Sequence, residues 1–369
     1  MTKALKLNKS TEQGVVEVLK HLLENKKVTG VFSLKKIDKN GAVAYSLITD
    51  AKDLEDAVPL YPLMPVNAGK LLSRFSLKGA PDELVAAVVK PCELRGFVEL
   101  IKREQGTLEN LLIISPTCGG VYPTKYQIDK TLEKNLSKYW DSVKKGEIVN
   151  DSRPTCRSCE EFVPYVADIT VDMLGKNDLD KQCMMFLNTK KAEEATKGIK
   201  ADFSDKQIDS KKLDKVREKR AAEKKKLFDE LDKKMNGIDG LVEIFGKCIG
   251  CHGCSKVCPI CYCVLCEFES SDSEYSPSNF ETELRKRPGL RVPPGTLYFH
   301  LGRMTHIGIS CVACGACDDV CPSDIPVAMV FKKVSESVQK MFDYIPGKDV
   351  EEEIPLITFK KDEFAEYES

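Results

Sequence analysis

The last third of the chain carries two cysteine runs of identical spacing, each closed by a proline. Both follow the pattern C-x2-C-x2-C-x3-C-P. Their cysteines are Cys248, Cys251, Cys254 and Cys258 in the first run, and Cys311, Cys314, Cys317 and Cys321 in the second. Three thiolates on one short loop can bind three corners of a 4Fe-4S cubane, whereas the fourth points toward the other cluster. The spacing therefore predicts two 4Fe-4S clusters that exchange one ligand.

The crossed pattern assigns a definite set of ligands to each cluster. One cluster takes Cys248, Cys251, Cys254 and Cys321, and the other takes Cys311, Cys314, Cys317 and Cys258. Zinc is the alternative, but zinc needs only four thiolates per site and usually shows simple C-x2-C pairs. Three histidines lie near the runs, where packing or hydrogen bonding beside a cluster is their ordinary role: His252, His300 and His306.

Four more cysteines form a looser group in the first half of the chain. They are Cys92, Cys118, Cys156 and Cys159. Two short apolar runs, residues 85–89 and 111–114, are predicted to be buried strands that lead into the loops of the first two cysteines. Loops at the ends of parallel strands converge, so these four thiolates could hold a third cubane. Alternatively, the first two are small buried residues and the C-x2-C pair binds zinc or nothing.

The remaining cysteines have no assignment. Cys261, Cys263 and Cys266 follow the first run directly, and Cys183 lies far from them. Three thiolates cannot complete a four-thiolate site. They could join a ligand from elsewhere, they could hold a metal at a subunit boundary, or they could be packing thiols in a core lined by clusters.

Composition restricts the remaining classes of function. Sixteen cysteines in 369 residues, with no secretory signal pattern, are expected to stay reduced in the cytoplasm and available as ligands. Because 56 basic residues balance 57 acidic ones, the net charge of −1 gives no field for gripping nucleic acid. No apolar run approaches the roughly 18 to 20 residues that span a bilayer. The sequence therefore predicts neither a nucleic-acid partner nor a membrane span.

Hydrophobic periodicity predicts an α/β core. The separation of 53 positions from Cys258 to Cys311, which helices can fill, favours a mostly α-helical ferredoxin domain after it. A possible capping box at residues 10–13 opens an amphipathic helix, and residues 31–37 and 42–48 are predicted to pair as a hairpin. A helix is expected at residues 297–307, between the two runs. The predicted domains are an iron-sulfur α/β domain at 1–187, a charged helical linker at 188–236, a two-cluster ferredoxin domain at 237–345 and a tail at 346–369.

Several motifs resemble the beta-subunit family of deazaflavin-coenzyme hydrogenases and formate dehydrogenases. They are Lys90-Pro91-Cys92, the loop Cys118-Gly119-Gly120 and the stretch 156–169, within a match over about residues 10–175. The resemblance implies that Cys92, Cys118, Cys156 and Cys159 hold a third cluster beside FAD. It also implies hydride exchange with the deazaflavin coenzyme or a related carrier such as NAD(P)H. The chain departs from the family in its Lys-Pro-Cys, where Thr-Pro-Cys is usual, and in placing the ferredoxin part after the core. That part resembles the helical ferredoxin domains of heterodisulfide reductase small subunits and succinate dehydrogenase iron-sulfur subunits.

Flavin contacts have no local motif, because no G-x-G-x-x-G follows a predicted strand and no phosphate loop occurs. The candidates are positions where small residues would admit a ligand or a lysine would meet phosphate: Gln13, Gly14, Asn67, Gly69 and Lys70. An ordinary loop and helix start is the alternative.

Together these patterns predict an electron-transfer subunit of an anaerobic oxidoreductase. In this reading FAD accepts hydride from its carrier, and three clusters pass single electrons to or from a catalytic subunit. Two rivals are a flavin-free iron-sulfur relay that docks in a formate dehydrogenase, hydrogenase or heterodisulfide reductase complex, and a zinc-binding regulator.

Overall fold

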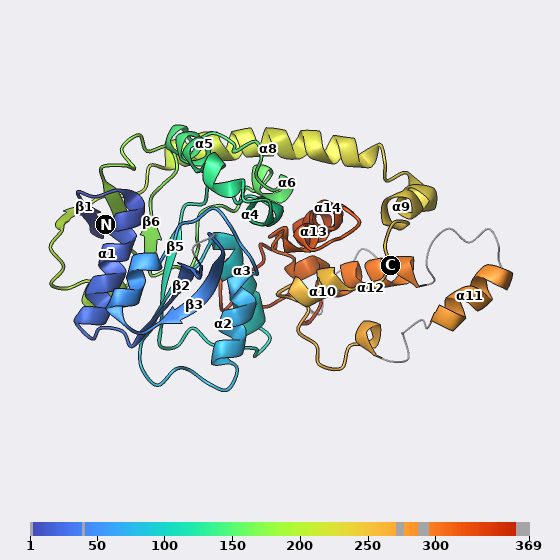
Figure 1. Cartoon of the computed structure of the whole chain (residues 1–369), viewed down its shortest axis with the longest axis horizontal. Helices are drawn as coiled ribbons and strands as arrows, with labels where there is room; N and C mark the ends of the chain where they lie inside the picture. Colours follow the sequence, from blue (N-terminus) through green and yellow to red (C-terminus); the bar gives the residue numbers. More distant parts are fainter. Residues whose placement is uncertain (1–2, 39–40, 271–276, 287–294, 359–369) are drawn as a thin grey trace, which may run out of the picture.

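The structure is a computed structural model that describes residues 3–38, 41–270, 277–286 and 295–358. Figure 1 shows a sheet-containing part and a helical C-terminal part, joined along one side by the long helix α8 (Ser210–Asp232). This arrangement confirms the predicted fold class of an α/β core plus a mostly helical domain. Residues 39–40 in the turn of the predicted hairpin lie outside the described residues, as do residues 271–276 and 287–294 between the two cysteine runs.

The core is a mixed sheet of eight strands in the described part of the chain, in the order β3-β2-β4-β5-β6-β7-β1-β8. Strands β2, β4, β5 and β6 run parallel to their neighbours in that series, and the remaining pairs are antiparallel. The strands are β1 (Lys3–Leu7), β2 (Gly30–Lys36), β3 (Val43–Ile48), β4 (Val85–Val88), β5 (Leu111–Pro116), β6 (Ile169–Val171), β7 (Cys183–Leu187) and β8 (Asp202–Asp205).

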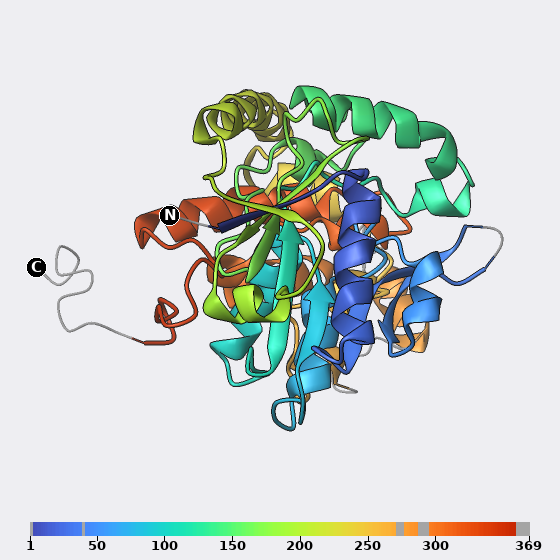
Figure 2. The same ribbon diagram turned by 90° about the vertical axis from the view of Figure 1, so that its left-hand side faces the viewer.

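Helices cover both faces of this sheet, as Figure 2 shows for α1 (Thr11–Glu24) on one of them. Alternate residues of the central strands face different cores, so that Val85 and Ala87 pack with α2 (Ala68–Ser76) and α3 (Pro91–Ile101), whereas Ala86 packs with α1. The other elements of this part are η1 (Ala51–Asp56), α4 (Lys125–Ile128), α5 (Leu132–Lys145), α6 (Pro154–Arg157) and α7 (Lys190–Ala195). Strands buried on both faces explain the wholly apolar runs in the sequence.

The predicted opening helix and hairpin are both confirmed. The Ser10 hydroxyl accepts a hydrogen bond from the Gln13 amide and caps α1, and β2 pairs with β3 in antiparallel register. Strand β8 lies beyond residue 187, where we placed the domain end, and extends the sheet at the edge of β1.

The C-terminal part is built from short helices around the two cysteine runs. It contains α9 (Gly237–Phe245), α10 (Gly253–Val257), η2 (Glu267–Glu269), α11 (Pro277–Lys286), α12 (Thr296–Ile307), η4 (Gly308–Ser310), α13 (Ala316–Asp319) and α14 (Val327–Met341). The predicted helix at 297–307 is confirmed as α12. Among the described residues, no helix is long and apolar enough to cross a bilayer.

A buried carboxyl in the first turn of α1 makes stability depend on pH. The Leu60 amide donates to Glu12 Oε1 at 3.4 Å, Oε2 is buried without a partner, and burial raises the pKa of Glu12 to about 7. An acid whose pKa rises on folding costs stability once the pH exceeds its unfolded value near 4.5, and the full cost is present above pH 7.

We therefore expect Glu12→Gln, which keeps the acceptor for Leu60, to stabilise the protein by roughly 1–3 kcal/mol at pH 8 and by much less at pH 5. Apparent thermal unfolding midpoints of both proteins at the two pH values measure this. An equal difference at pH 5 and pH 8 would contradict the assignment.

Candidate iron-sulfur centres

Four cysteines from both runs line one cavity of the C-terminal part. We call them the outer set: Cys248, Cys251, Cys254 and Cys321. The thiols of Cys251 and Cys321 are close enough to raise the pKa values of Cys248 and Cys254. Burial first, and then the nearby thiols of Cys251 and Cys321, raise the pKa of Cys248, although the Gly250 amide opposes them. The Cys251 residue is exposed, so this set lies at the protein surface. The grouping is the one that the crossed pattern predicts.

The other four cysteines of the two runs line a second cavity. We call them the middle set: Cys258, Cys311, Cys314 and Cys317. Cys258 directly follows α10, Cys311 and Cys314 lie between η4 and α13, and Cys317 lies within α13. Burial, Asp318 and the three other thiols of the set raise the pKa of Cys317. Each run therefore supplies three cysteines to one set and one to the other.

The four cysteines of the α/β part also converge. We call them the inner set: Cys92, Cys118, Cys156 and Cys159. Cys92 lies in the first turn of α3, which follows β4, and Cys118 follows β5. Cys156 lies within α6, and Cys159 lies just after that helix. Burial raises the pKa of Cys92, and so do Cys314, Glu93, Cys118 and Cys156 around it. Since Cys314 belongs to the middle set, the inner and middle sets are neighbours.

Backbone amides point at sulfur atoms in two of the sets. The Gly250 amide donates to Cys248 Sγ at 3.4 Å, the Ile325 amide donates to Cys321 Sγ at 3.4 Å, and the Gly120 amide donates to Cys118 Sγ at 3.3 Å. Such hydrogen bonds favour the thiolate and are one means by which proteins adjust cluster potentials. No three or more His, Cys, Asp or Glu side chains in the described ranges are grouped so as to hold a single metal ion. A cubane spaces its thiolates widely, because each binds a different iron atom.

Three buried arginines accompany the cysteine sets. Arg220, on α8, donates to the carbonyl oxygens of Cys118 at 2.9 Å and Cys159 at 3.3 Å. Arg153 donates to the Cys314 carbonyl at 3.0 Å and forms an ion pair with Asp319. It therefore links the α/β part to the middle set.

The third arginine, Arg303 on α12, donates from Nη1 to Cys254 Sγ at 3.1 Å and from Nη2 to the Cys254 carbonyl at 3.2 Å. The Nε atoms of Arg220 and Arg303 are buried with no hydrogen-bond partner in the protein. Buried cations with spare donors beside four thiols each suit an anionic group such as a thiolate-bound cluster, so the donor sets fit 4Fe-4S.

The histidines of the C-terminal part stack on aromatic rings. His300 is buried among the residues around the outer set, both of its ring nitrogens lack partners, and its ring lies 4.1 Å from that of Phe245. Burial, with help from Arg303 and His252, lowers the pKa of His300 to about 4, which keeps the ring neutral. The His252 ring stacks on Phe299 at 4.1 Å.

The five predicted flavin contacts are not gathered around one cavity. A Cβ at Gly14 would lie 2.3 Å from Cys183 Cβ, and one at Gly69 would lie 2.4 Å from the Glu93 carbonyl oxygen. Gly14 therefore allows α1 to pack closely on β7, and Gly69 allows α2 to pack closely on α3. Asn67 caps α2 through the Gly69 amide, and Gln13 is exposed.

Lys70 completes a contact between the two parts of the chain. Its ammonium donates to the carbonyl oxygens of Lys256, Cys258 and Cys261. Lys70 therefore binds the backbone at the end of the first run and just beyond it. A flavin role for these five residues stays a prediction.

The unassigned cysteines occupy different places. Cys183 is buried in β7 against Gly14. Cys261 borders the first run, where the Cys258 thiol is hydrogen-bonded to it and Arg303 Nη2 lies 3.8 Å from its sulfur. Cys263 is exposed and Cys266 is half-buried.

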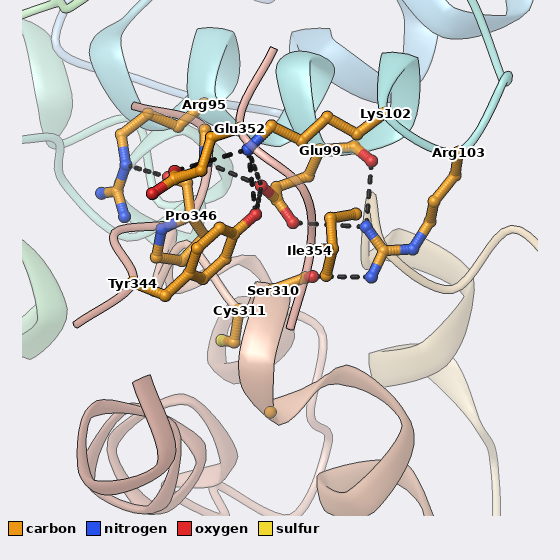
Figure 3. A network of polar contacts seen from close by, with 12 residues as sticks. Arg95, Glu99, Lys102, Arg103, Ser310, Cys311, Tyr344, Pro346, Glu352 and Ile354 are labelled. Atoms are coloured by element: carbon orange, nitrogen blue, oxygen red, sulfur yellow. Dashed lines mark hydrogen bonds and ion pairs between the residues drawn. The ribbon is translucent and has the colours of Figure 1, made fainter. Parts of the chain in front are cut away.

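A buried polar network joins α3 to the C-terminal segment beside the middle set, as Figure 3 shows. The Glu99 carboxylate accepts hydrogen bonds from the Tyr344 hydroxyl and the Gly347 amide, and it pairs with Lys102 and Arg103. Arg103 donates in turn to the Ser310 hydroxyl at 2.6 Å, next to Cys311. The residues after 345, predicted as a tail, therefore pack on the α/β part up to at least residue 347.

The arginines are the functional candidates that the sequence analysis missed. In α8, Arg220 continues the apolar stripe of Leu213 and Val216 at helical spacing, and in α12, Arg303 lies one turn from both Phe299 and Ile307. A single arginine on the apolar stripe of a helix was the sequence pattern that could have indicated a buried cation. Arg95 donates a hydrogen bond to the carbonyl of Pro346, and Arg157 donates one to the carbonyl of Asn150.

Comparisons with known proteins support an oxidoreductase. No family model matches the chain. It is 27% identical over 366 residues to the F420-dependent formate dehydrogenase subunit beta of Methanocaldococcus jannaschii. It is 29% identical over 371 residues to the F420-dependent formate dehydrogenase 1 subunit beta of Methanococcus maripaludis. Both alignments cover 91% of this chain and 91% of the relative.

A chain from the solved F420-reducing NiFe hydrogenase complex of Methanosarcina barkeri is 18% identical, with a TM-score of 0.44, over 65% of this chain and 94% of that one. The similarity to the two curated beta subunits confirms the resemblance seen in the cysteine motifs. The protein is an oxidoreductase subunit that is similar over nearly its whole length to formate dehydrogenase beta subunits.

Proposed function

We propose that this chain carries electrons through three 4Fe-4S clusters within a multi-subunit oxidoreductase. The single observation that carries the proposal is the arrangement of the inner, middle and outer sets as a continuous series. Cys92 neighbours Cys314 at the first junction, and Cys254 and Cys258 lie at opposite ends of the short helix α10 at the second. When bound, each cluster would take up and release one electron at a time.

The protein's own groups suit this role by position and charge. The series starts in the α/β part and ends at exposed Cys251, so its outer end is accessible to a partner. Each set has a buried guanidinium beside it that offsets the negative charge of four thiolates. Amide donors and buried cations favour the reduced state of an anionic group.

The hydride-handling end is the finer part of the proposal. The relatives are named as F420-dependent, so we infer that the α/β part exchanges electrons with the deazaflavin coenzyme or NAD(P)H through FAD. A catalytic formate dehydrogenase or hydrogenase subunit in the cytoplasm would be the partner at the other end.

A flavin-free relay is the second candidate, and one observation favours it. Gly14, Gly69 and Lys70, the residues expected to admit or bind a flavin, are engaged in packing and in contacts with the protein's own carbonyls.

Anaerobic purification of the full chain distinguishes these readings. About twelve iron atoms per chain with extractable flavin would support the full proposal, and about twelve without flavin would support the relay. Adding reduced deazaflavin coenzyme, NADH or NADPH in turn and following bleaching of the cluster absorbance identifies the carrier. About eight iron atoms would remove the inner cluster from the proposal, and zinc in place of iron would overturn it.

A further inference from the structure

Arg303 occupies a place between two of the cysteine sets. Its guanidinium contacts Cys254 of the outer set and also lies in the wall of the cavity formed by the middle set. The residue is 3% exposed. In the described ranges, no other cationic side chain donates a hydrogen bond to the sulfur of an assigned ligand.

The surroundings hold this guanidinium in one orientation. It lies over the rings of Phe299 and Phe331, with 5.4 and 5.1 Å between its central carbon and the ring centroids. Nη2 donates a hydrogen bond to the Cys254 carbonyl oxygen, while Nε is buried without a hydrogen-bond partner. Only Nη1 donates a hydrogen bond to a sulfur of the outer set. The two aromatic rings and the Cys254 carbonyl therefore position this hydrogen bond, in addition to the attraction between the charges.

The charge of Arg303 is secure. A guanidinium is not deprotonated in proteins, so the side chain carries its positive charge at every working pH. No carboxylate forms an ion pair with it among the described contacts, where Arg153 by contrast has Asp319. A buried cation with no carboxylate partner is not neutralised by the protein, so its charge acts directly on a cluster that the neighbouring thiolates bind.

We propose that Arg303 is a positioning residue that raises the reduction potentials of the outer and middle clusters together. The inference rests on the proposed function, because it needs both clusters. Reduction adds one electron to a cluster, with no bond formed and no proton moved, and the arginine stays protonated. The fixed positive charge stabilises the more negative, reduced state of either neighbour.

The test is a redox titration of the full anaerobic chain with dithionite, followed by electron paramagnetic resonance, on wild type, Arg303→Met and Arg303→Lys. In the Met variant, two of the three midpoints should fall so that reduction is at least tenfold less favourable, or about 59 mV for a one-electron couple. The third midpoint should not move. The Lys variant should shift less, because it keeps the charge and loses the fixed geometry.

A matched control is Arg285→Met, which removes an arginine whose side chain is 84% exposed on α11. It should leave every midpoint unchanged. Unchanged midpoints in Arg303→Met, with full iron content, would overturn the inference and leave the proposed function intact. Loss of a cluster in the Met variant with retention in the Lys variant would also overturn it, since Arg303 would then act in assembly. Wild-type protein without clusters would instead defeat the proposed function.

Discussion

A Cys258→Ala variant is expected to lose the middle cluster and to keep the outer one, although Cys258 belongs to the first run. The reason is the crossing of ligands, since Cys258 shares its cavity with Cys311, Cys314 and Cys317. Iron content should fall from about twelve to about eight atoms per chain. Because the middle set separates the other two, electron passage between the hydride carrier and the partner should fall to background.

Iron analysis, Mössbauer spectroscopy and carrier-dependent reduction of an external acceptor measure these effects. Cys263→Ala is the matched control, because Cys263 lies a few residues further along, is exposed and belongs to none of the three sets. It should keep full iron content and transfer. If Cys258→Ala removed the signal of the outer cluster instead, the crossed assignment would be wrong.

Replacing Glu99 with alanine should cause the largest loss of stability. Glu99 is fully buried and faces Lys102 and Arg103, whose side chains are 3% and 8% exposed. Removing the carboxylate leaves buried Arg103 without its carboxylate partner and leaves Lys102 with only the more exposed Glu352. It also leaves the Tyr344 hydroxyl and Gly347 amide without their acceptor. Breaking a buried ion pair from one side costs about 3–5 kcal/mol.

The apparent free energy of unfolding in denaturant, measured on cluster-loaded protein, should fall by that amount. Limited proteolysis should also begin near residues 345–350, because the network holds this segment on α3. Glu109→Ala removes an exposed carboxylate shortly after the same helix and should change neither readout. A loss below about 1 kcal/mol for Glu99→Ala would show that the network does not anchor the segment.

The cysteine sets could be predicted from sequence because cluster ligands obey local spacing. The two runs determined six of the eight assignments within single loops, and the known exchange of the fourth cysteine supplied Cys258 and Cys321. The inner set needed a resemblance in addition, because its loops are joined only by the parallel strands β4 and β5. That the twelve cysteines bind iron is a prediction for the iron count to test.

The arginines and the flavin contacts could not be predicted in the same way. Whether Arg303 faces solvent or two thiol clusters depends on how α12 packs against α14, which no local pattern encodes. Gly14 and Gly69 were interpreted as openings for a ligand, yet small residues equally permit close packing, and here a neighbouring side chain or backbone fills the space. The short strands β6 and β8 were missed because they gain their pairing from distant neighbours.

Because the two runs exchange a ligand, the loss of one cluster would have a limited effect on the structure around it. Cys258 and Cys311 are 53 positions apart in the sequence, and each of the two cavities draws cysteines from both runs. Either cluster alone would therefore keep the two loops cross-linked. If oxygen destroyed the outer cluster at exposed Cys251, the middle cluster would still hold the two runs together. The structural change would therefore remain local, and the four outer cysteines would stay in place to bind a new cluster.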